Sequence, residues 1–296
     1  MAPLFEIFYF IDDFCKHFQG KINQRVLPNP NRKRNRLSAL SLSEIMTITV
    51  MFHLSSYRTF KDFYVSYVCV YWRNEFPNLV SYNRFIELMP NAFMPLLILM
   101  NYCSGQKTGR YYIDSTKLSV CDNLRIYRHK VFKDIAKRGK TSTGWFFGFK
   151  LHLVTNQLGE IVRFAITPGN IDDRSVVKKL SDGLKGWLFG DKGYLGKDLK
   201  DSLFAKGIEL FTSMRKNMKQ LKITKLQKAF LNKRGVIETI IDQLKSISHI
   251  QHTRHRSTSN FLVNLVAGLL AYTFKPSKPS VSFHNSTSSF STLMPS

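Results

Sequence analysis

Three acidic residues of the chain lie at positions where a carboxylate could do chemistry. Asp114 lies within an apolar, β-rich stretch, where a carboxylate is unfavourable unless it is paired or bound to a metal. Asp191 directly follows the apolar segment 187–189, and ligands collect at the carboxyl ends of strands in α/β sheets. Glu238 lies within the apolar helical run 236–241, at least at the edge of its buried face. In a chain with 20 acidic residues among 296, these positions mark a candidate site.

The chemistry that these three carboxylates favour is metal-dependent. Three converging carboxylates can hold two divalent cations, which stabilise the attacking and leaving oxygens during phosphodiester cleavage. Ligands that are all oxygen favour Mg²⁺, with Mn²⁺ as the alternative, over zinc. We therefore expect two Mg²⁺ ions, held by the same residues that are catalytic, namely Asp114, Asp191 and Glu238.

Two basic residues share a helical stripe with Glu238. At about 100° per residue, Arg234 lies about −40° and Lys245 about −20° from Glu238 around the helix. Cations beside a metal-binding carboxylate can grip the phosphates of a substrate strand. An ordinary ion-paired surface stripe would have the same pattern, but the two aspartates favour the functional interpretation.

The charge of the whole chain indicates a polyanionic partner. There are 44 Lys and Arg residues against 20 Asp and Glu residues, a formal net charge of +24. Such an excess destabilises a compact protein by self-repulsion, and nucleic acid is the obvious polyanion to balance it. A basic protein of the ribosome or the membrane surface is the alternative.

The segment 124–140 is the clearest local concentration of this charge, with Asp134 as its one acid. It lies between the first and second predicted strands, close to Asp114. We interpret it as a DNA-gripping loop, and a merely solvated charged loop is the alternative. Its basic residues are Arg125, Arg128, Lys130, Lys133, Lys137, Arg138 and Lys140.

Three histidines recur at every third position in His249, His252 and His255. A zinc site is conceivable, but no cysteine or carboxylate cluster joins them. We favour contact with phosphate, alongside Arg254 and Arg256.

Four further polar residues have two possible roles each. His152, in the second predicted strand, could lie near the metals or could be a buried, hydrogen-bonded core residue. Asp172 and Asp173 are predicted to cap a helix, with metal contact as the alternative. Lys192, beside Asp191, is either a phosphate ligand or simply exposed.

Other features exclude several protein classes. The four cysteines have no zinc-binding spacing, and the first 14 residues lack the basic start of a signal peptide. The apolar runs 92–100 and 261–274 are too short to span a bilayer, and Pro95 interrupts the first. We expect a cytoplasmic protein with no membrane partner, associated with the nucleoid when it is bound to DNA.

Residues 1–108 are predicted to be helical. Helices are expected over 5–18, from a capping box at Ser41 and Glu44 to Leu54, over 59–72, and from Ser81 to about residue 89. The Pro-rich turn 28–31 leads into the basic segment 32–36. This region suits a small DNA-binding module, although a helical pack that only braces the next domain is the alternative.

Residues 109–274 change to an α/β pattern, and 275–296 form a Ser/Pro/Thr-rich tail that we expect to be disordered. Strands are predicted at 111–118, 146–154, 161–167, 187–189 and 209–212. Helices are predicted at 173–180, 196–205, 219–231, 236–247 and 258–271. Hairpins come first and helical crossovers follow, which is the order of a ribonuclease H-like mixed sheet flanked by helices.

Three blocks of sequence carry a family resemblance: Tyr-Ile-Asp114-Ser-Thr, Phe-Gly-Asp191-Lys-Gly-Tyr and Ile-Glu238-Thr-Ile-Ile-Asp-Gln-Leu-Lys245. They resemble the three blocks of DDE insertion-sequence transposases, and the chain to about residue 274 is similar to the bacterial insertion-sequence family numbered 982. Related enzymes often carry Tyr-x2-Arg-x3-Glu-x6-Lys around the glutamate. Arg234, Glu238 and Lys245 fit it, and Leu231 occupies the tyrosine position.

The resemblance implies a transposase that binds double-stranded DNA, both the terminal inverted repeats of its element and the target, as a homodimer. It further implies metal-dependent strand cleavage followed by strand transfer. The residues alone support only metal-dependent phosphodiester chemistry. Two alternatives stay open: a nuclease of the same fold without strand transfer, and a non-catalytic DNA-binding protein, such as a decayed transposase.

Overall fold

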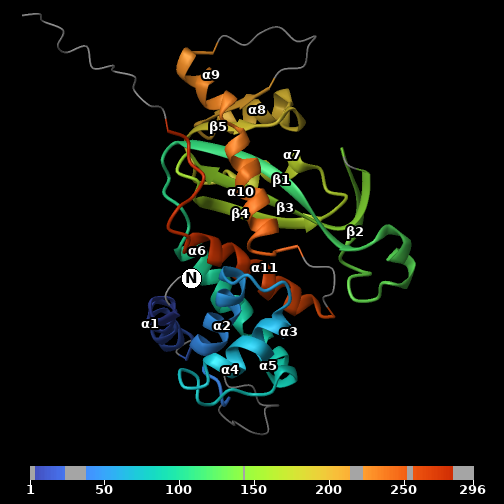
Figure 1. Cartoon of the computed structure of the whole chain (residues 1–296). Coiled ribbons are helices and arrows are strands. Elements are labelled where there is room, and N and C mark those ends of the chain that lie inside the picture. The colour runs from blue at the N-terminus through green and yellow to red at the C-terminus, as the bar shows by residue number, and fades with distance from the viewer. Residues whose placement is uncertain (1–3, 24–37, 143, 214–222, 252–255, 283–296) are drawn as a thin grey trace, which may run out of the picture.

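The computed structural model describes residues 4–23, 38–142, 144–213, 223–251 and 256–282. A mixed β-sheet crosses the middle of the molecule, with helices on both of its faces and a helical block beneath it (Figure 1). The basic segment 32–36 and the Pro-rich turn before it lie outside the described residues.

The described residues form one six-stranded sheet. Its strands are β1 (Arg110–Cys121), β2 (Lys137–Thr141), β3 (Gly144–Asn156), β4 (Ile161–Pro168), β5 (Gly186–Gly190) and β6 (Ile208–Thr212). β1 is central, antiparallel to β3 on one side and parallel to β5 on the other, with β6 parallel to β5. On the edge of β3 that faces away from β1, β2 pairs antiparallel with the first part of the strand. β4 pairs antiparallel with the rest of that edge.

This topology confirms the predicted fold class, a ribonuclease H-like mixed sheet flanked by helices. The tight turn between β3 and β4 lies where the sequence predicts a hairpin. There the Gly159 N–H donates to the Asn156 carbonyl over 3.1 Å. Gly159 has a φ of +79°, which only glycine adopts readily. Parallel strands need long crossovers, and helices supply them before β5 and β6.

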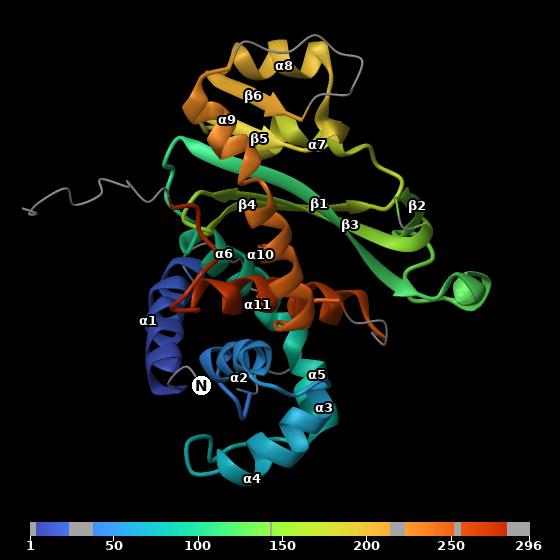
Figure 2. The same ribbon diagram turned by 45° about the horizontal axis from the view of Figure 1, so that its top comes forward.

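Different helices cover the two faces of the sheet (Figure 2). One face packs against α7 (Asp173–Leu180) and α8 (Lys197–Phe204) in a separate hydrophobic cluster. The other face packs against α10 (Gly235–Ser246) and α11 (Thr258–Thr273), with α9 (Lys225–Asn232) near β5. In place of the predicted helix 219–231, the described helix α9 begins at Lys225, after its cap Thr224. Residues 214–222 lie outside the described residues.

The N-terminal region is helical, as expected, and two of its helix starts follow the predicted caps. Ser41 forms a capping box with Glu44, and the Ser81 hydroxyl accepts from the Arg84 N–H. The predicted single helix 59–72 instead contains a π-helical centre. The elements are α1 (Leu4–Asn23), α2 (Leu42–Leu54), α3 (Phe60–Asp62), η1 (Phe63–Val68), α4 (Cys69–Tyr71), α5 (Tyr82–Leu88), η2 (Met89–Ala92) and α6 (Phe93–Tyr102).

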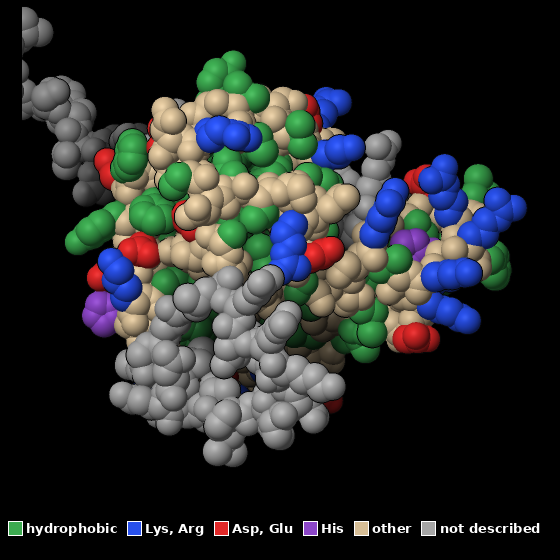
Figure 3. Space-filling model, turned by 90° about the horizontal axis from the view of Figure 1, so that it is seen from below, with side chains coloured by type: hydrophobic (Ala, Val, Ile, Leu, Met, Phe, Trp, Pro, Cys, Tyr) green, Lys and Arg blue, Asp and Glu red, His purple; other side chains and the backbone are tan. Residues whose placement is uncertain are grey.

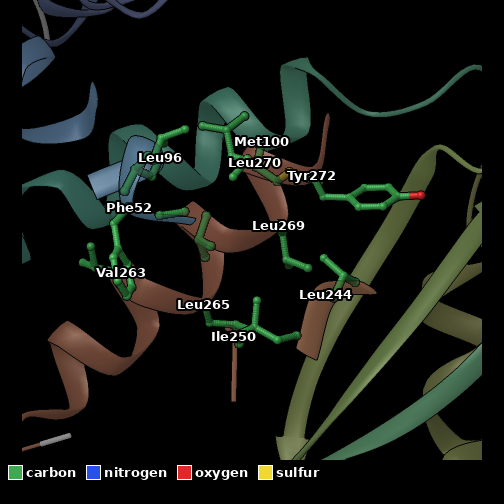
Figure 4. Close-up of a cluster of buried hydrophobic side chains, with 14 of the residues drawn as sticks. Phe52, Leu96, Met100, Leu244, Ile250, Val263, Leu265, Leu269, Leu270 and Tyr272 are labelled. Atoms are coloured by element: carbon green, nitrogen blue, oxygen red, sulfur yellow. The ribbon is translucent and has the colours of Figure 1, made fainter. Parts of the chain in front are cut away.

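Helix α11 joins the sheet to the N-terminal helices. It is apolar around most of its circumference, which suits a helix buried on all sides. Leu265 and Leu269 point toward Leu244 and Ile250, while Leu270 lies among Met100 and its neighbours on α6 (Figure 4). One hydrophobic cluster therefore runs from the helical block through α11 to the sheet, and the division at residue 108 stays a prediction.

The structure differs from three expectations drawn from the sequence. Pro95 does not interrupt an apolar helix, because it lies in the first turn of α6, where proline is tolerated. The helical stretch Tyr82–Tyr102 is long and apolar enough to cross a membrane by length and composition alone, but helices in soluble cores pass the same test. Part of the tail is ordered, since Val281 N–H donates to the Gln157 carbonyl and Lys278 bonds the Thr273 carbonyl.

Candidate active site

Asp114 and Asp191 lie side by side on one face of the sheet. Tyr112 of β1 is in register with Phe189 of β5, and the two aspartates follow two residues later on their strands. Because side chains alternate along a strand, both point to the same face as that pair, on strands about 4.8 Å apart. β5 ends at Gly190, so the Asp191 side chain is exposed, whereas Asp114 is partly buried.

Helix α10 brings Glu238 to the same face of β1. Arg234, at the start of this helix, donates from Nη2 to Glu238 Oε1 over 2.5 Å. Its Nη1 lies 3.9 Å from Asp114 Oδ2. One guanidinium therefore ties the glutamate of the helix to the aspartate of the central strand.

The raised pKa of Asp114 reflects burial first and the negative charge of its neighbours second. Burial is the largest cause that raises it from its usual value to about 6, and nearby Glu238 and Asp191 contribute to this rise. A hydrogen bond from the Ser115 N–H and the charge of Arg234 act in the opposite direction. A cation at this point would relieve the repulsion that remains.

Metal binding fits the chemistry of the donors. Among the residues that the structure describes, no three His, Cys, Asp or Glu side chains lie close enough together to hold a metal ion. At the candidate site Arg234 lies between Asp114 and Glu238 and supplies positive charge there. The donors are all carboxylate oxygens, which suit Mg²⁺ or Mn²⁺, and a rotation of the Arg234 side chain would free them.

Lys245 lies further along α10, as the predicted stripe requires. It is partly buried, and burial lowers its pKa, as does the nearby charge of Lys117 on β1. Lys117 was not among the residues predicted from the sequence. Its position three residues after Asp114, directly beyond the first block, was the signal that could have found it.

The opposite face of the same strands carries a second polar cluster beneath α7. His152 is in register with Ser115, so it points away from Asp114. Its Nε2 lies 2.8 Å from Thr167 Oγ1, and its side chain is buried, which favours the core role over metal contact. Lys150 Nζ donates to Asp173 Oδ1 over 2.9 Å.

The other side chains near β5 are also placed. The Asp172 side chain accepts from the Arg174 N–H, which confirms the predicted cap. Lys192 is exposed. Tyr194, a residue of the second block that the sequence analysis did not single out, is buried, and a Cβ at Gly190 would lie 3.0 Å from its ring.

The basic segment 124–140 projects from the body of the protein as an arm. The structure corrects the prediction of a loop, because the segment contains η3 (Asn123–Arg128) and β2, which pairs with β3. Arg138 therefore lies on a strand and not in a loop. Lys and Arg side chains gather on this projecting lobe (Figure 3).

The residues predicted to contact phosphate near the start of α11 are only partly among the described residues. Arg256 precedes α11 and is exposed, and its charge reaches Tyr82. Arg254, His252 and His255 lie outside the described residues, so neither zinc nor phosphate contact is tested there. His249 is partly buried with a φ of +46°.

Comparison with known proteins gives a family for this arrangement. The sequence matches no curated protein. A cryo-EM structure of the piggyBac transposase synaptic complex with hairpin DNA is similar, with 13% sequence identity, 92% of this chain and 73% of that chain covered, and a TM-score of 0.49. Residues 104–258, more than half of the chain, match the family model described as a transposase DDE domain. The chain therefore belongs to the family of DDE-domain transposases.

Proposed function

We propose that the protein is the transposase of an insertion sequence, which binds the ends of its element and cuts and joins DNA strands there. The observation that carries the proposal is the meeting of Asp114 and Asp191 on one sheet face, with Glu238 linked to them through Arg234. Three carboxylates and one cation leave a negative centre, which suits a divalent metal and a phosphodiester.

Each residue of the site has a role in this proposal. Asp114, Asp191 and Glu238 would hold two Mg²⁺ ions, which when bound stabilise the negative charge that develops on the oxygens of the phosphodiester. Arg234 and Lys245 would orient the substrate strand by binding its phosphates. Further phosphate contacts are proposed for Arg128, Lys130, Lys133, Arg138, Arg254 and Arg256.

The proposed reaction has two steps. Water attacks the phosphorus at the element's end, the P–O3′ bond breaks, and a 3′-hydroxyl and a 5′-phosphate result. The freed 3′-hydroxyl then attacks a phosphodiester of target DNA, forms a new P–O bond and releases a 3′-hydroxyl of the target. A homodimer would hold the two ends of the element together, on DNA in the bacterial cytoplasm.

Incubating the purified protein with labelled ends of its element, target plasmid and Mg²⁺ tests this proposal. Joined products are expected, and they should disappear when EDTA replaces Mg²⁺. Cut but unjoined ends would instead indicate a nuclease. Binding without any cutting, in Mg²⁺ and in Mn²⁺ alike, would identify a non-catalytic DNA-binding protein.

A further inference from the structure

The arm formed by residues 122–141, here called the η3–β2 arm, exposes large apolar side chains that a solvated basic loop would not need. Leu124 is 95% exposed and Tyr127 is 89% exposed. Trp145, which faces the arm from the start of β3, is 61% exposed. Apolar groups gathered on one exposed projection mark a contact surface.

The exposed rings alternate with cations along one side of the arm. The guanidinium carbon of Arg138 lies 5.7 Å from the centre of the Tyr127 ring. The Lys140 ammonium lies 5.6 Å from the Trp145 ring, and these two residues are register partners on β2 and β3. Arg138 and Lys140 are two residues apart on one strand, so they point to the same side. The four side chains therefore form one strip of rings and cations.

The strip has a firm base. Phe132 is buried, stacks on His129 and packs edge-on against Phe149 of the sheet and Phe261 of α11. The Asn123 side-chain amide donates to the Trp145 carbonyl over 2.9 Å. The base of the arm is thus fixed to the core, which lowers the entropic cost of binding.

The charge of the arm identifies the kind of partner. Residues 122–141 contain seven Lys and Arg residues and two acids, which opposes an apolar or basic protein partner and favours a polyanion. Duplex DNA offers phosphates to the cations but hides the faces of its bases. Unpaired bases offer both phosphate and an open ring face, so a strip of rings and cations fits a single strand better.

We propose that the strip formed by Tyr127, Arg138, Lys140 and Trp145 binds unpaired DNA bases by stacking, in addition to the duplex contacts proposed above. This inference rests on the proposed function. Trp145 lies two residues before Phe147, the register partner of Cys121 at the end of β1. Cys121 follows Asp114 by seven positions along this strand. At about 3.3 Å per residue that is roughly 23 Å, or about seven base pairs of duplex. The unpaired bases would therefore lie roughly 23 Å from the cleaved phosphate.

Binding of two labelled DNA probes of equal length tests the proposal: oligo(dT) as the single strand and a fully paired duplex. Tyr127→Ala and Trp145→Ala should each weaken oligo(dT) binding by at least about five-fold and leave duplex binding nearly unchanged. Trp145→Phe keeps a ring and should restore most of the affinity. Tyr102→Ala on α6, where the tyrosine is 75% exposed and distant from the arm, is the matched control and should change neither.

Other outcomes separate this inference from the proposed function. If the ring variants bind oligo(dT) as the wild type does, stacking is wrong, while duplex binding and cleavage still support a transposase. Equal losses on both probes, in variants whose circular dichroism is unchanged, would also overturn stacking and return the arm to a phosphate-binding role. If the wild type binds neither probe, the proposed function itself fails.

Discussion

The two faces of the central strands carry polar clusters of opposite charge balance. On the α10 face, Asp114, Asp191 and Glu238 share one cation, Arg234. On the α7 face, the charge of Asp173 is matched by that of Lys150, which also bonds the Ile171 carbonyl. Both clusters lie on the same strands and within a few residues of each other.

This difference separates a structural cluster from a functional one. Charges that are paired inside the fold need nothing from outside, although removing one partner of such a pair is costly. Charges of one sign held together by the fold are costly, so they indicate a ligand that supplies the opposite charge. Burial raises the pKa of Asp114 to about 6, whereas Asp173 keeps a cation at 2.9 Å.

The largest expected effect is the loss of DNA cleavage in Asp191→Asn. The change removes a proposed metal ligand and keeps the shape of the side chain. Cleavage should fall by more than roughly 100-fold, because losing even an indirect partner of a metal ligand costs about 10- to 100-fold. DNA affinity, which depends mainly on Lys and Arg contacts with phosphate, should change little. Gel assays of cleavage and binding measure both.

Asp173→Asn is the matched change on the other face. Its folded protein should cleave DNA at close to the wild-type rate, because Asp173 is paired with Lys150 and does not face Asp114. Equal cutting by Asp191→Asn and wild type would remove the catalytic role from the α10 face. Equal loss in both variants would mean that the two clusters act as one site.

The second expected effect is stabilisation of the wild type by Mg²⁺. A ligand that binds only the folded state at 100 times its dissociation constant stabilises it by about 2.7 kcal/mol. Asp191→Asn should lose most of this gain. Without metal the variant should be no less stable than the wild type, because it removes repulsion with Asp114. Thermal unfolding with Mg²⁺ and with EDTA gives both numbers, and an equal Mg²⁺ shift in both proteins would contradict the site.

Much of this comparison could be predicted from the sequence, because it depends on local pattern. The acid inside the apolar stretch around Asp114 and the strand end before Asp191 were enough to predict their placement. Helical periodicity placed Arg234 on the stripe of Glu238, and the ion pair follows from that spacing. The capping signal at Asp172 was likewise local.

The parts that could not be predicted depend on distant contacts. β2 is a polar strand, Lys-Arg-Gly-Lys-Thr, without apolar alternation, and only its pairing with β3 makes it a strand. The buried surroundings of α11 come from α2 and α6, which lie far away in the sequence. The partner of Asp173 is Lys150, 23 residues earlier, so spacing alone could not show that its charge is matched.

The third expected effect is a loss of stability in Asp173→Asn. The Lys150 side chain is 13% exposed, so the change leaves a mostly buried ammonium without its carboxylate. Fully buried pairs cost about 3–5 kcal/mol when one partner is removed, and the partial exposure of Asp173 reduces this to about 2 kcal/mol. Asp172→Asn is the matched control, since its salt bridge is exposed and asparagine caps helices equally well. Urea denaturation compares them, and equal stability of the two variants would show that the Lys150 pair contributes nothing.

The smallest expected effect is a pH dependence of stability from His152. Burial lowers the pKa of this histidine from 6.5 to about 4, and Asp173 only partly opposes the shift. The unfolded chain therefore binds a proton between pH 6.5 and 4 that the folded chain does not, and stability falls as pH drops through this window. Between pH 7 and pH 5 the loss should be about 1–2 kcal/mol.

Other groups titrate in the same range, so the measurement must be a difference between two proteins. His53 is buried with a pKa lowered to about 4 and acts in the same direction, whereas the raised pKa of Asp114 acts in the opposite one. His152→Gln keeps a side chain that can bond Thr167 and removes only the titration at this position. The stability advantage of wild type over the variant should therefore shrink as pH falls from 7 to 5, while both proteins keep the other contributions. A difference that stays constant over this range would mean that His152 is accessible to protons in the fold. The contrast between the two faces requires the cluster beneath α7 to be closed to solvent, and this result would show that it is open.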